Sequence, residues 1–457
     1  MKNKRDNLKP IKKKNNTKKN LKIKTNNLKK NKKKTKTKNT KFIIIGISLI
    51  IVVLLLGLTT YSLQKNKPVI TRNEKKEIKI DYRNYFYNIV NTKNEKKLYE
   101  LKEDNFEEIG KVSMGITLEL IEDEYIDKGY FKIKDLDYYI DYKDLEEGLK
   151  EEKNNFFKNY IPFNLSIKTN EVTNLYQDNS LVYSINIPME LPILIKEENF
   201  YGVMYKDKLF YVKKDEATTI EQKNTDLKYT NGISALVYHA TYDSKNKEEK
   251  QKCLNNNATI CLSDIQFDTQ MKYLKDFNFY TATMKDIEYF IDGKVQLPER
   301  TVLITIDDGY YFDASAKILE KYDLHATLFL IGGLAEVPEW KTDSWYSKNV
   351  ELHSHTYLMH TPNVCSGGQG SILKCGNKEE LLADLKKSRE QLNGSTVFCY
   401  PFFEYNDYAI NVLKEAGFTM AFAGGRQKIK VGSNKMKLPR YGVINTSTME
   451  DFKRIIY

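Results

Sequence analysis

The chain has 457 residues, which is long enough for two to three domains. Its formal net charge is +12, but residues 1–40 hold 18 Lys or Arg and a single acid, giving +17 there and −5 over residues 41–457. The basic balance therefore belongs to a tail, which excludes a basic nucleic-acid-binding domain, and we expect no nucleic-acid partner. The tail is rich in Lys, Asn and Thr and cannot bury a core, so residues 1–41 are predicted to be disordered.

An uncharged segment of 22 residues, Phe42 to Leu63, follows the tail. As a helix rising about 1.5 Å per residue, it can cross a hydrocarbon core of about 30 Å. Because the flanking lysines lie on its N-terminal side, the tail is predicted to be cytoplasmic and the chain beyond about residue 64 extracellular. A cleaved signal peptide fits less well, since the charged and apolar stretches are too long and no A-x-A site follows. We predict a single-pass membrane anchor at 42–63.

All five cysteines lie in the predicted extracellular part. Two pairs span short polar stretches, Cys253 with Cys261 and Cys365 with Cys375. Two short-loop disulfides are expected there, with four reduced surface thiols as the alternative. Cys399 lies in an apolar run and is expected to be a buried thiol.

Two stretches, 92–150 and 160–216, alternate apolar and charged residues after a polar linker at 64–91. This period of two, with many aromatic residues, is typical of half-buried antiparallel strands. Both stretches resemble the final hairpin of bacterial SH3-like barrels, which implies two small all-β SH3-like modules. Such modules could be a stalk or could bind wall or glycan, and we favour the stalk.

The pattern changes after a second polar linker at 217–231. Over residues 232–457, strand-like apolar runs alternate with segments of helical spacing. This alternation predicts an α/β domain with parallel strands, in the form of a distorted (β/α) barrel. In such barrels the active site lies where the strands end in sequence.

The predicted strand ends are unusually polar. One ends in His239, another in Asp307 and Asp308, and a third in His355, with His360 five residues further on. Two imidazoles and one carboxylate suit Zn²⁺ or a similar divalent ion with a bound water, and a second carboxylate could then accept the water's proton. The alternative is an ordinary strand followed by an Asp-Gly turn.

Local geometry bears on this interpretation of the strand ends. Consecutive residues of a regular strand point to opposite faces, so Asp307 and Asp308 share a site only if the chain turns sharply, which Gly309 permits. On a helix His355 and His360 would lie about 140° apart, so we expect a strand end and a loop.

Residues 232–457 resemble the polysaccharide deacetylases of the NodB-homology group, carbohydrate esterase family four. "TIDDG" (Thr305–Gly309) and "SHTYLMH" (Ser354–His360) resemble the first two motifs of this family. The longer His-to-His spacing, "FCYPFFEYN" (Phe398–Asn406) and "LVYH" before residue 240 are similar to the branch of poly-N-acetylglucosamine de-N-acetylases.

The resemblance implies a role for each motif residue. Asp307 would be the general base and His239 the general acid that protonates the leaving amine. The metal ligands would be Asp308, His355 and His360. The backbone N–H of Phe402 would join the metal in stabilising the oxyanion.

Other residues near these motifs have open interpretations. Cys399 stands where many family members have an arginine that tunes the base, and Phe403 stands where a glycine is expected. Arg440 could pair with Asp307 or cap a strand. Tyr400 and Trp345 could stack on sugar or pack in the core. The remaining histidines, His325 and His353, are expected to be a loop residue and a packed residue.

These features predict a membrane-anchored, extracellular, metal-dependent de-N-acetylase, a hydrolase of amide carbon–nitrogen bonds. The expected substrate is N-acetylglucosamine in peptidoglycan or another surface glycan. The same site could instead remove O-acetyl groups, or the chain could be a non-catalytic wall-binding protein. The complete set of motif residues argues against the last possibility. The sequence does not choose between glycans, because substrate grooves lie in variable loops.

Overall fold

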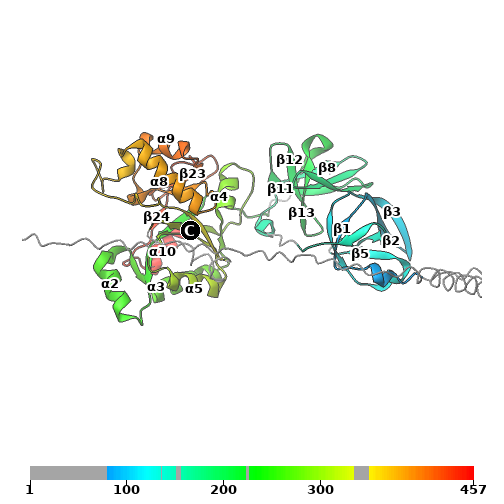
Figure 1. The fold of residues 1–457 in the computed structure, drawn as a ribbon, viewed down its shortest axis with the longest axis horizontal. Coiled ribbons are helices and arrows are strands. Elements are labelled where there is room, and N and C mark those ends of the chain that lie inside the picture. Colours follow the sequence, from blue (N-terminus) through cyan, green and yellow to red (C-terminus); the bar gives the residue numbers. More distant parts are fainter. Residues whose placement is uncertain (1–79, 135, 151–155, 223–225, 334–348) are drawn as a thin grey trace, which may run out of the picture. The chain divides into compact units, whose positions relative to one another are not determined.

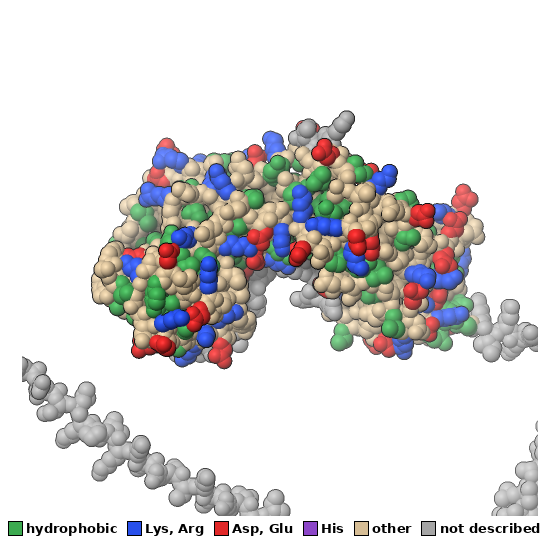
Figure 2. All heavy atoms as spheres, turned by 90° about the horizontal axis from the view of Figure 1, so that it is seen from above, with side chains coloured by type: hydrophobic (Ala, Val, Ile, Leu, Met, Phe, Trp, Pro, Cys, Tyr) green, Lys and Arg blue, Asp and Glu red, His purple; other side chains and the backbone are tan. Residues whose placement is uncertain are grey.

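The computed structural model describes residues 80–457 except 135, 151–155, 223–225 and 334–348 (Figure 1). The predicted tail, the membrane span and most of the first linker lie outside these residues. Within them, every helix is too short or too polar to cross a membrane. Residues 80–457 form one compact unit. On the face drawn in Figure 2, basic and acidic side chains are interspersed over this unit.

The first part of the unit is an antiparallel β region, as the alternation predicted. Its strands are β1 (Ile89–Thr92), β2 (Lys96–Lys102), β3 (Asn105–Val112), β4 (Thr117–Ile121), β5 (Tyr130–Ile133), β6 (Tyr138–Asp141), β7 (Leu145–Glu147), β8 (Leu165–Thr169), β9 (Thr173–Gln177), β10 (Ser180–Ile185), β11 (Glu190–Lys196), β12 (Phe200–Tyr205), β13 (Lys208–Lys213) and β14 (Ala217–Glu221). Residues 217–221, expected in a linker, thus form a strand paired with β8.

Tight hairpins join several of these strands. The residue pairs Glu103–Asp104, Asp178–Asn179 and Lys206–Asp207 all have positive φ. Two consecutive positive φ values match the twist that a two-residue hairpin needs, and Asp and Asn tolerate them better than most residues do. These turns fix the register of the pairs β2–β3, β9–β10 and β12–β13.

The two predicted modules share one sheet and one core. Strand β10 pairs with β3, so that β1–β14 form a single hydrogen-bonded order. Side chains from both halves, such as Leu98 and Phe210, belong to one hydrophobic cluster. Gly110 lies at the junction, where a Cβ would come within 2.0 Å of the Ser184 carbonyl oxygen. Only glycine allows the two strands to approach so closely. The SH3-like assignment stays a prediction.

The second part of the unit is an α/β domain, as predicted. Its strands are β15 (Ser234–Tyr238), β16 (Ala240–Tyr242), β17 (Cys261–Ser263), β18 (Tyr280–Thr281), β19 (Thr301–Asp308), β20 (Ala326–Leu330), β21 (Val350–Ser354), β22 (Val397–Cys399), β23 (Met420–Phe422) and β24 (Tyr441–Gly442). Its helices are α2 (Lys247–Asn257), α3 (Asp264–Asp276), α4 (Met284–Ile291), α5 (Asp313–Tyr322), α8 (Lys378–Gln391), α9 (Asp407–Glu415) and α10 (Met449–Ile456). Helices α3, α5 and α10 lie on one side of the sheet and α8 and α9 on the other (Figure 1).

The central sheet is parallel and runs β23-β22-β21-β20-β19-β15-β24, with β18 beside β19. Leu438 exchanges backbone hydrogen bonds with Ala421 in β23 and with Ala423 just after it. Three residues later the chain enters β24, which pairs with β15. The segment before β24 therefore bridges the two ends of the sheet, which gives the distorted barrel that the sequence predicted.

Strand β19 is buried on both faces, as strands of parallel sheets usually are. Val302, Ile304 and Ile306 pack in one hydrophobic cluster, whereas Leu303 packs in another. Asp307 continues the face of Leu303 by strand alternation. The first acid of "TIDDG" is thereby directed into the interior of the barrel.

The β region and the α/β domain share a hydrophobic core. One cluster contains buried side chains from both: Phe157, Tyr160, Leu194, Ile195, Ile287, Phe290 and Val295. The Tyr160 hydroxyl donates to Asp286 Oδ1 at 2.7 Å. The backbone N–H groups of Ile161 and Lys196 donate to the carbonyls of Gln296 and Lys294, each at 2.8 Å.

We therefore expect a fragment of residues 217–457 to be much less stable than one of residues 80–457. The shorter fragment lacks Phe157, Tyr160, Leu194 and Ile195, whose burial contributes about 1.5–3 kcal/mol for each such side chain. It should show a lower thermal midpoint and aggregate. Thermal unfolding of both fragments followed by circular dichroism tests this, and equal midpoints would contradict the shared core.

Candidate active site

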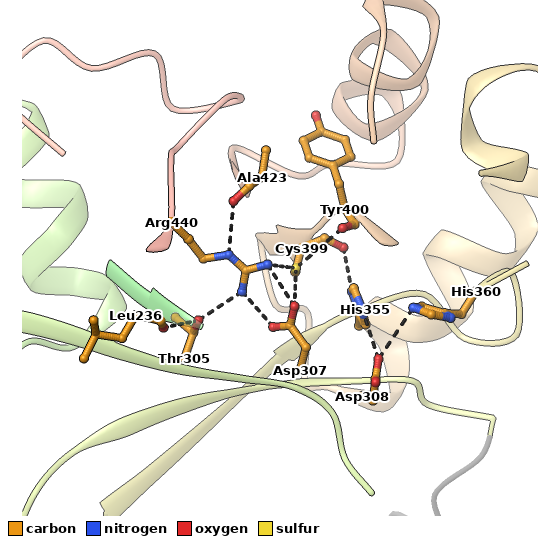
Figure 3. Close-up of polar contacts among 10 residues, drawn as sticks. All are labelled: Leu236, Thr305, Asp307, Asp308, His355, His360, Cys399, Tyr400, Ala423 and Arg440. Carbon is orange, nitrogen blue, oxygen red and sulfur yellow. Dashed lines mark hydrogen bonds and ion pairs between the residues drawn. The ribbon is translucent and has the colours of Figure 1, made fainter. Parts of the chain in front are cut away.

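The predicted site residues meet at the carboxyl ends of the barrel strands. Asp307 and Asp308 end β19, His355 directly follows β21, and His239 directly follows β15. His360 reaches the same place from the loop after β21. In Figure 3 the rings of His355 and His360 converge on Asp308, and Asp307 lies beside them.

Three side chains form a candidate metal site. The Nε2 atoms of His355 and His360 lie 3.4 and 3.5 Å from Asp308 Oδ1. All three ligand atoms lie within 4.8 Å of one another. His355 Nδ1 lies 2.8 Å from the Cys399 carbonyl oxygen, a bond that orients the ring and leaves Nε2 for a metal. One carboxylate and two imidazoles fit a divalent ion with open coordination positions.

Asp307 is held by a buried arginine. Arg440 Nη1 and Nη2 donate to the two carboxylate oxygens at 2.7 and 2.8 Å, and both side chains are almost fully buried. Burial alone would raise the pKa of Asp307, but the charge and hydrogen bonds of Arg440 outweigh it and hold the pKa below its usual value. Asp307 is therefore ionised at neutral pH. Of the two interpretations of Arg440, the structure has the pairing with Asp307.

A second possible metal-binding group overlaps the first. Asp307, His355 and Cys399 also place ligand atoms within 4.8 Å of one another. Both oxygens of Asp307, however, already accept from Arg440, whose Nη2 also lies 2.8 Å from Cys399 Sγ. A metal there would face a guanidinium cation. The group of Asp308 is therefore the better candidate for a metal, and Cys399 is the free buried thiol that the sequence predicted.

Comparison with known proteins agrees with this geometry. Residues 294–421 match the sequence model of the polysaccharide deacetylase family. The C-terminal domain is a polysaccharide deacetylase domain. The predicted resemblance and enzyme class are thereby confirmed. Related N-deacetylases are hydrolases of amide carbon–nitrogen bonds and are in general metal-dependent.

Similar proteins include curated relatives and solved structures. Poly-β-1,6-N-acetyl-D-glucosamine N-deacetylase of Staphylococcus aureus (strain MRSA252) is 28% identical over 247 residues, 47% of this chain and 80% of that protein. A de-N-acetylase structure from Aggregatibacter actinomycetemcomitans is 22% identical with a TM-score of 0.42, covering 49% of this chain and 99% of that chain. A polysaccharide deacetylase structure from Bacillus cereus is 19% identical with a TM-score of 0.41, covering 77% of this chain and 100% of that chain.

A sharp turn brings both acids of the deacetylase domain to the site. Asp308 has φ of +74° and Gly309 has φ of +101°. The predicted turn is present, but it begins at Asp308 itself and not only at the glycine. A left-handed conformation costs a residue with a Cβ about 1–2 kcal/mol. Aspartate tolerates it better than most residues, and the turn breaks the alternation that would otherwise separate the two carboxylates.

His239 lies close enough to Asp307 and Asp308 for their charges to affect its pKa. Burial lowers its pKa, although Asp307 and Asp308 act in the opposite direction. At neutral pH the imidazole is therefore uncharged before reaction. To protonate a leaving amine, it has to gain a proton within the site first.

The segment after β22 places an aromatic pair at the site. Phe402 and Phe403 have φ of +60° and +62°. The Phe402 ring lies 4.5 Å from the ring of His360, the third residue of the candidate metal group. Tyr400 is fully buried, and its hydroxyl donates to the Met436 carbonyl oxygen. Its ring is packed in the core and is not exposed to sugar, whereas Trp345 lies outside the described residues.

The structure contains both predicted disulfides, Cys253–Cys261 and Cys365–Cys375. The second closes the loop that begins just after His360. The Glu404 carboxylate holds this loop by accepting from Ser371 N at 2.9 Å and pairing with Lys374 Nζ at 3.0 Å. Glu404 was missed from the sequence, because its partners are mainly backbone groups of a loop.

The other two histidines, His325 and His353, both contact the carboxylate of Glu351. His325 Nε2 and His353 Nε2 lie 3.1 and 3.5 Å from its two carboxylate oxygens. His353 Nδ1 also lies 2.7 Å from Ser395 Oγ. His353 is thus a packed residue, as expected. The sequence signal for this contact was the spacing of Glu351 and His353, which share one face of β21.

We expect the deacetylase domain to bind about one divalent ion and His355→Ala to abolish this binding, since the variant loses the most buried ligand. The matched control is His353→Ala, two residues away and outside the site, which should retain the ion. Elemental analysis of the purified proteins measures both. Equal metal content in the parent and His355→Ala would refute the assignment.

Proposed function

We propose that the chain removes N-acetyl groups from a polymer of N-acetylglucosamine at the cell surface. One observation carries the proposal: a carboxylate kept ionised by a buried arginine, Asp307, lies next to a metal-type group of one carboxylate and two imidazoles. These groups are the ones that metal-assisted hydrolysis with a general base requires. The named activity of the Staphylococcus aureus relative supports an N-acetylglucosamine polymer as the substrate.

Each residue has a proposed part in the reaction. Asp308, His355 and His360 would hold a divalent ion, for which we propose Zn²⁺, and a bound ion would supply Lewis-acid chemistry for the acetyl carbonyl and for water. Asp307 accepts the proton of the attacking water, and Arg440 keeps Asp307 ionised until then. His239 receives the proton that Asp307 took from the water and gives it to the leaving nitrogen. The N–H of Phe402 orients the acetyl oxygen.

Acetate release tests this function. Residues 80–457 with Zn²⁺ should release acetate from β-1,6-linked N-acetylglucosamine oligomers, and His355→Ala should not. Purified peptidoglycan and an O-acetylated polysaccharide serve as competing substrates. Release from peptidoglycan alone would assign another glycan, release from the O-acetylated polymer alone would assign O-deacetylation, and release from none would refute the proposal.

We also propose that the chain is anchored in the membrane with the deacetylase domain outside the cell. The uncharged segment 42–63 after a basic tail supports this, and two disulfides suit an oxidising compartment. Protease added to intact, wall-stripped cells should remove the deacetylase domain and spare the tail. Survival of the domain until lysis would show that the orientation is wrong.

A further inference from the structure

Phe403 has a backbone conformation that suits glycine. Its φ is +62°, and it follows Phe402, whose φ is +60°. A bulky side chain is an uncommon occupant of this left-handed region, whereas glycine adopts it freely. The resemblance to the deacetylase family also leads us to expect glycine at this position. The chain thus carries a side chain that the backbone disfavours at this position, and such outliers concentrate at functional sites.

The inner side of the Phe403 ring lies over the arginine that holds the base. The Arg440 guanidinium carbon is 5.2 Å from the ring centroid, a distance typical of a cation–π contact. Gly424 leaves the space for this packing, because a Cβ on Gly424 would come within 3.3 Å of Phe403 Cβ and Cγ. The ring therefore closes this side of the Arg440–Asp307 pair against water.

The outer part of the ring is open. Phe403 is 36% exposed, whereas Arg440 is 1% exposed. The residue before it, Phe402, packs on His360 of the metal group. An exposed aromatic ring thus packs on the arginine that pairs with Asp307 and directly follows the phenylalanine that packs on His360. Hydrolysis there brings the sugar that carries the acetyl group to the same rim, where the apolar C–H face of a pyranose can pack on an aromatic ring.

We propose that Phe403 is a specificity-determining residue that stacks against a pyranose ring of the glycan substrate. This inference rests on the proposed function and deepens it, because it names the side chain that selects a sugar over other acetylated groups. Glycine in place of Phe403 would relieve the left-handed strain, but it would leave the sugar without an apolar surface and Arg440 without its cover.

The test compares a sugar substrate with a sugarless one, using the full chain in detergent with Zn²⁺. For Phe403→Gly we expect the KM for an N-acetylglucosamine pentamer to rise about tenfold, and at least fivefold more than the KM for 4-nitrophenyl acetate. Phe403→Tyr retains the ring and should keep the pentamer KM within about twofold of the parent. The matched control is Phe277→Gly, which removes another exposed phenylalanine, at the end of α3.

The outcomes separate this inference from the proposed function. An equal change in KM for both substrates, or a fall in kcat alone, would mean that Phe403 acts only through Arg440 and would overturn the sugar contact. If the parent released no acetate from the pentamer, the proposed function would fail. Calorimetric binding of the pentamer to parent and Phe403→Gly would still decide the inference, and equal affinities would overturn it. Circular dichroism confirms that each variant is folded.

Discussion

Asp307→Asn should retain the metal ion and lose turnover by about 10²–10⁴-fold, the usual range for loss of a general base. Asp308→Asn should lose both, because Asp308 is the carboxylate that both histidines face. The two variants differ because both carboxylate oxygens of Asp307 accept hydrogen bonds from Arg440, whereas Asp308 Oδ1 faces the two imidazoles. Metal content by elemental analysis and acetate release measure the two effects.

The control for this comparison is His239→Ala. It should retain the metal and lose turnover, and an activated ester with a good leaving group should be less sensitive to it than an N-acetyl sugar. If Asp307→Asn released acetate as fast as the parent, the two acids would not have separate roles. The adjacent carboxylates would then be no more than a strand end and a turn.

Arg440→Met should destabilise the fold by about 3–5 kcal/mol, the cost of leaving one partner of a buried ion pair alone. Arg454→Met is the matched control, because Arg454 is 71% exposed and pairs with Glu450 and Asp451 on the surface. The control should change stability by less than about 1 kcal/mol. Urea unfolding measures both, and equal effects would contradict the buried pair.

The effect of pH on this variant has a definite sign. With Arg440 present, the pKa of Asp307 is below its usual value, so the pair stabilises the fold above about pH 4 and this contribution is lost as pH falls through the folded-state pKa. In Arg440→Met the main lowering influence is gone, so burial, opposed by the smaller effects of His355 and His239, raises the pKa of Asp307 relative to the parent. The loss of stability should therefore be largest at neutral pH and shrink as the pH falls from the higher pKa of Asp307 in the variant towards its lowered pKa in the parent. A loss that does not vary with pH would argue against an ionised Asp307.

The sequence predicted best where the chemistry is local. Strand alternation indicated that Asp307 and Asp308 share a site only if the chain turns sharply, and the glycine after Asp308 indicated that turn. From the sequence, the pairing of Arg440 with Asp307 was only one of two interpretations. The two residues are 133 positions apart, and no local sequence pattern indicates the sheet closure that brings them together.

Other contacts left no readable signal at all. The pairing of β3 with β10 depends on one small residue, Gly110, which is paired with Ile185 and leaves room for the Ser184 carbonyl oxygen. Two modules of similar pattern therefore predicted two separate domains, and not the single sheet that the structure has. Glu404 resembles any loop acid, since its partners are backbone N–H groups and one lysine.

The core shared by the β region and the deacetylase domain has a consequence for cooperativity. Ile195 and Ile287 lie in one cluster, and backbone hydrogen bonds cross between the two parts. Opening one part removes the partners of the other, so both should unfold in one transition and not as a stalk and an enzyme in sequence. Slowly exchanging amides in β11 and β15 should then report the same opening free energy. A substitution such as Tyr160→Ala, outside the active site, would in that case reduce the population of active enzyme.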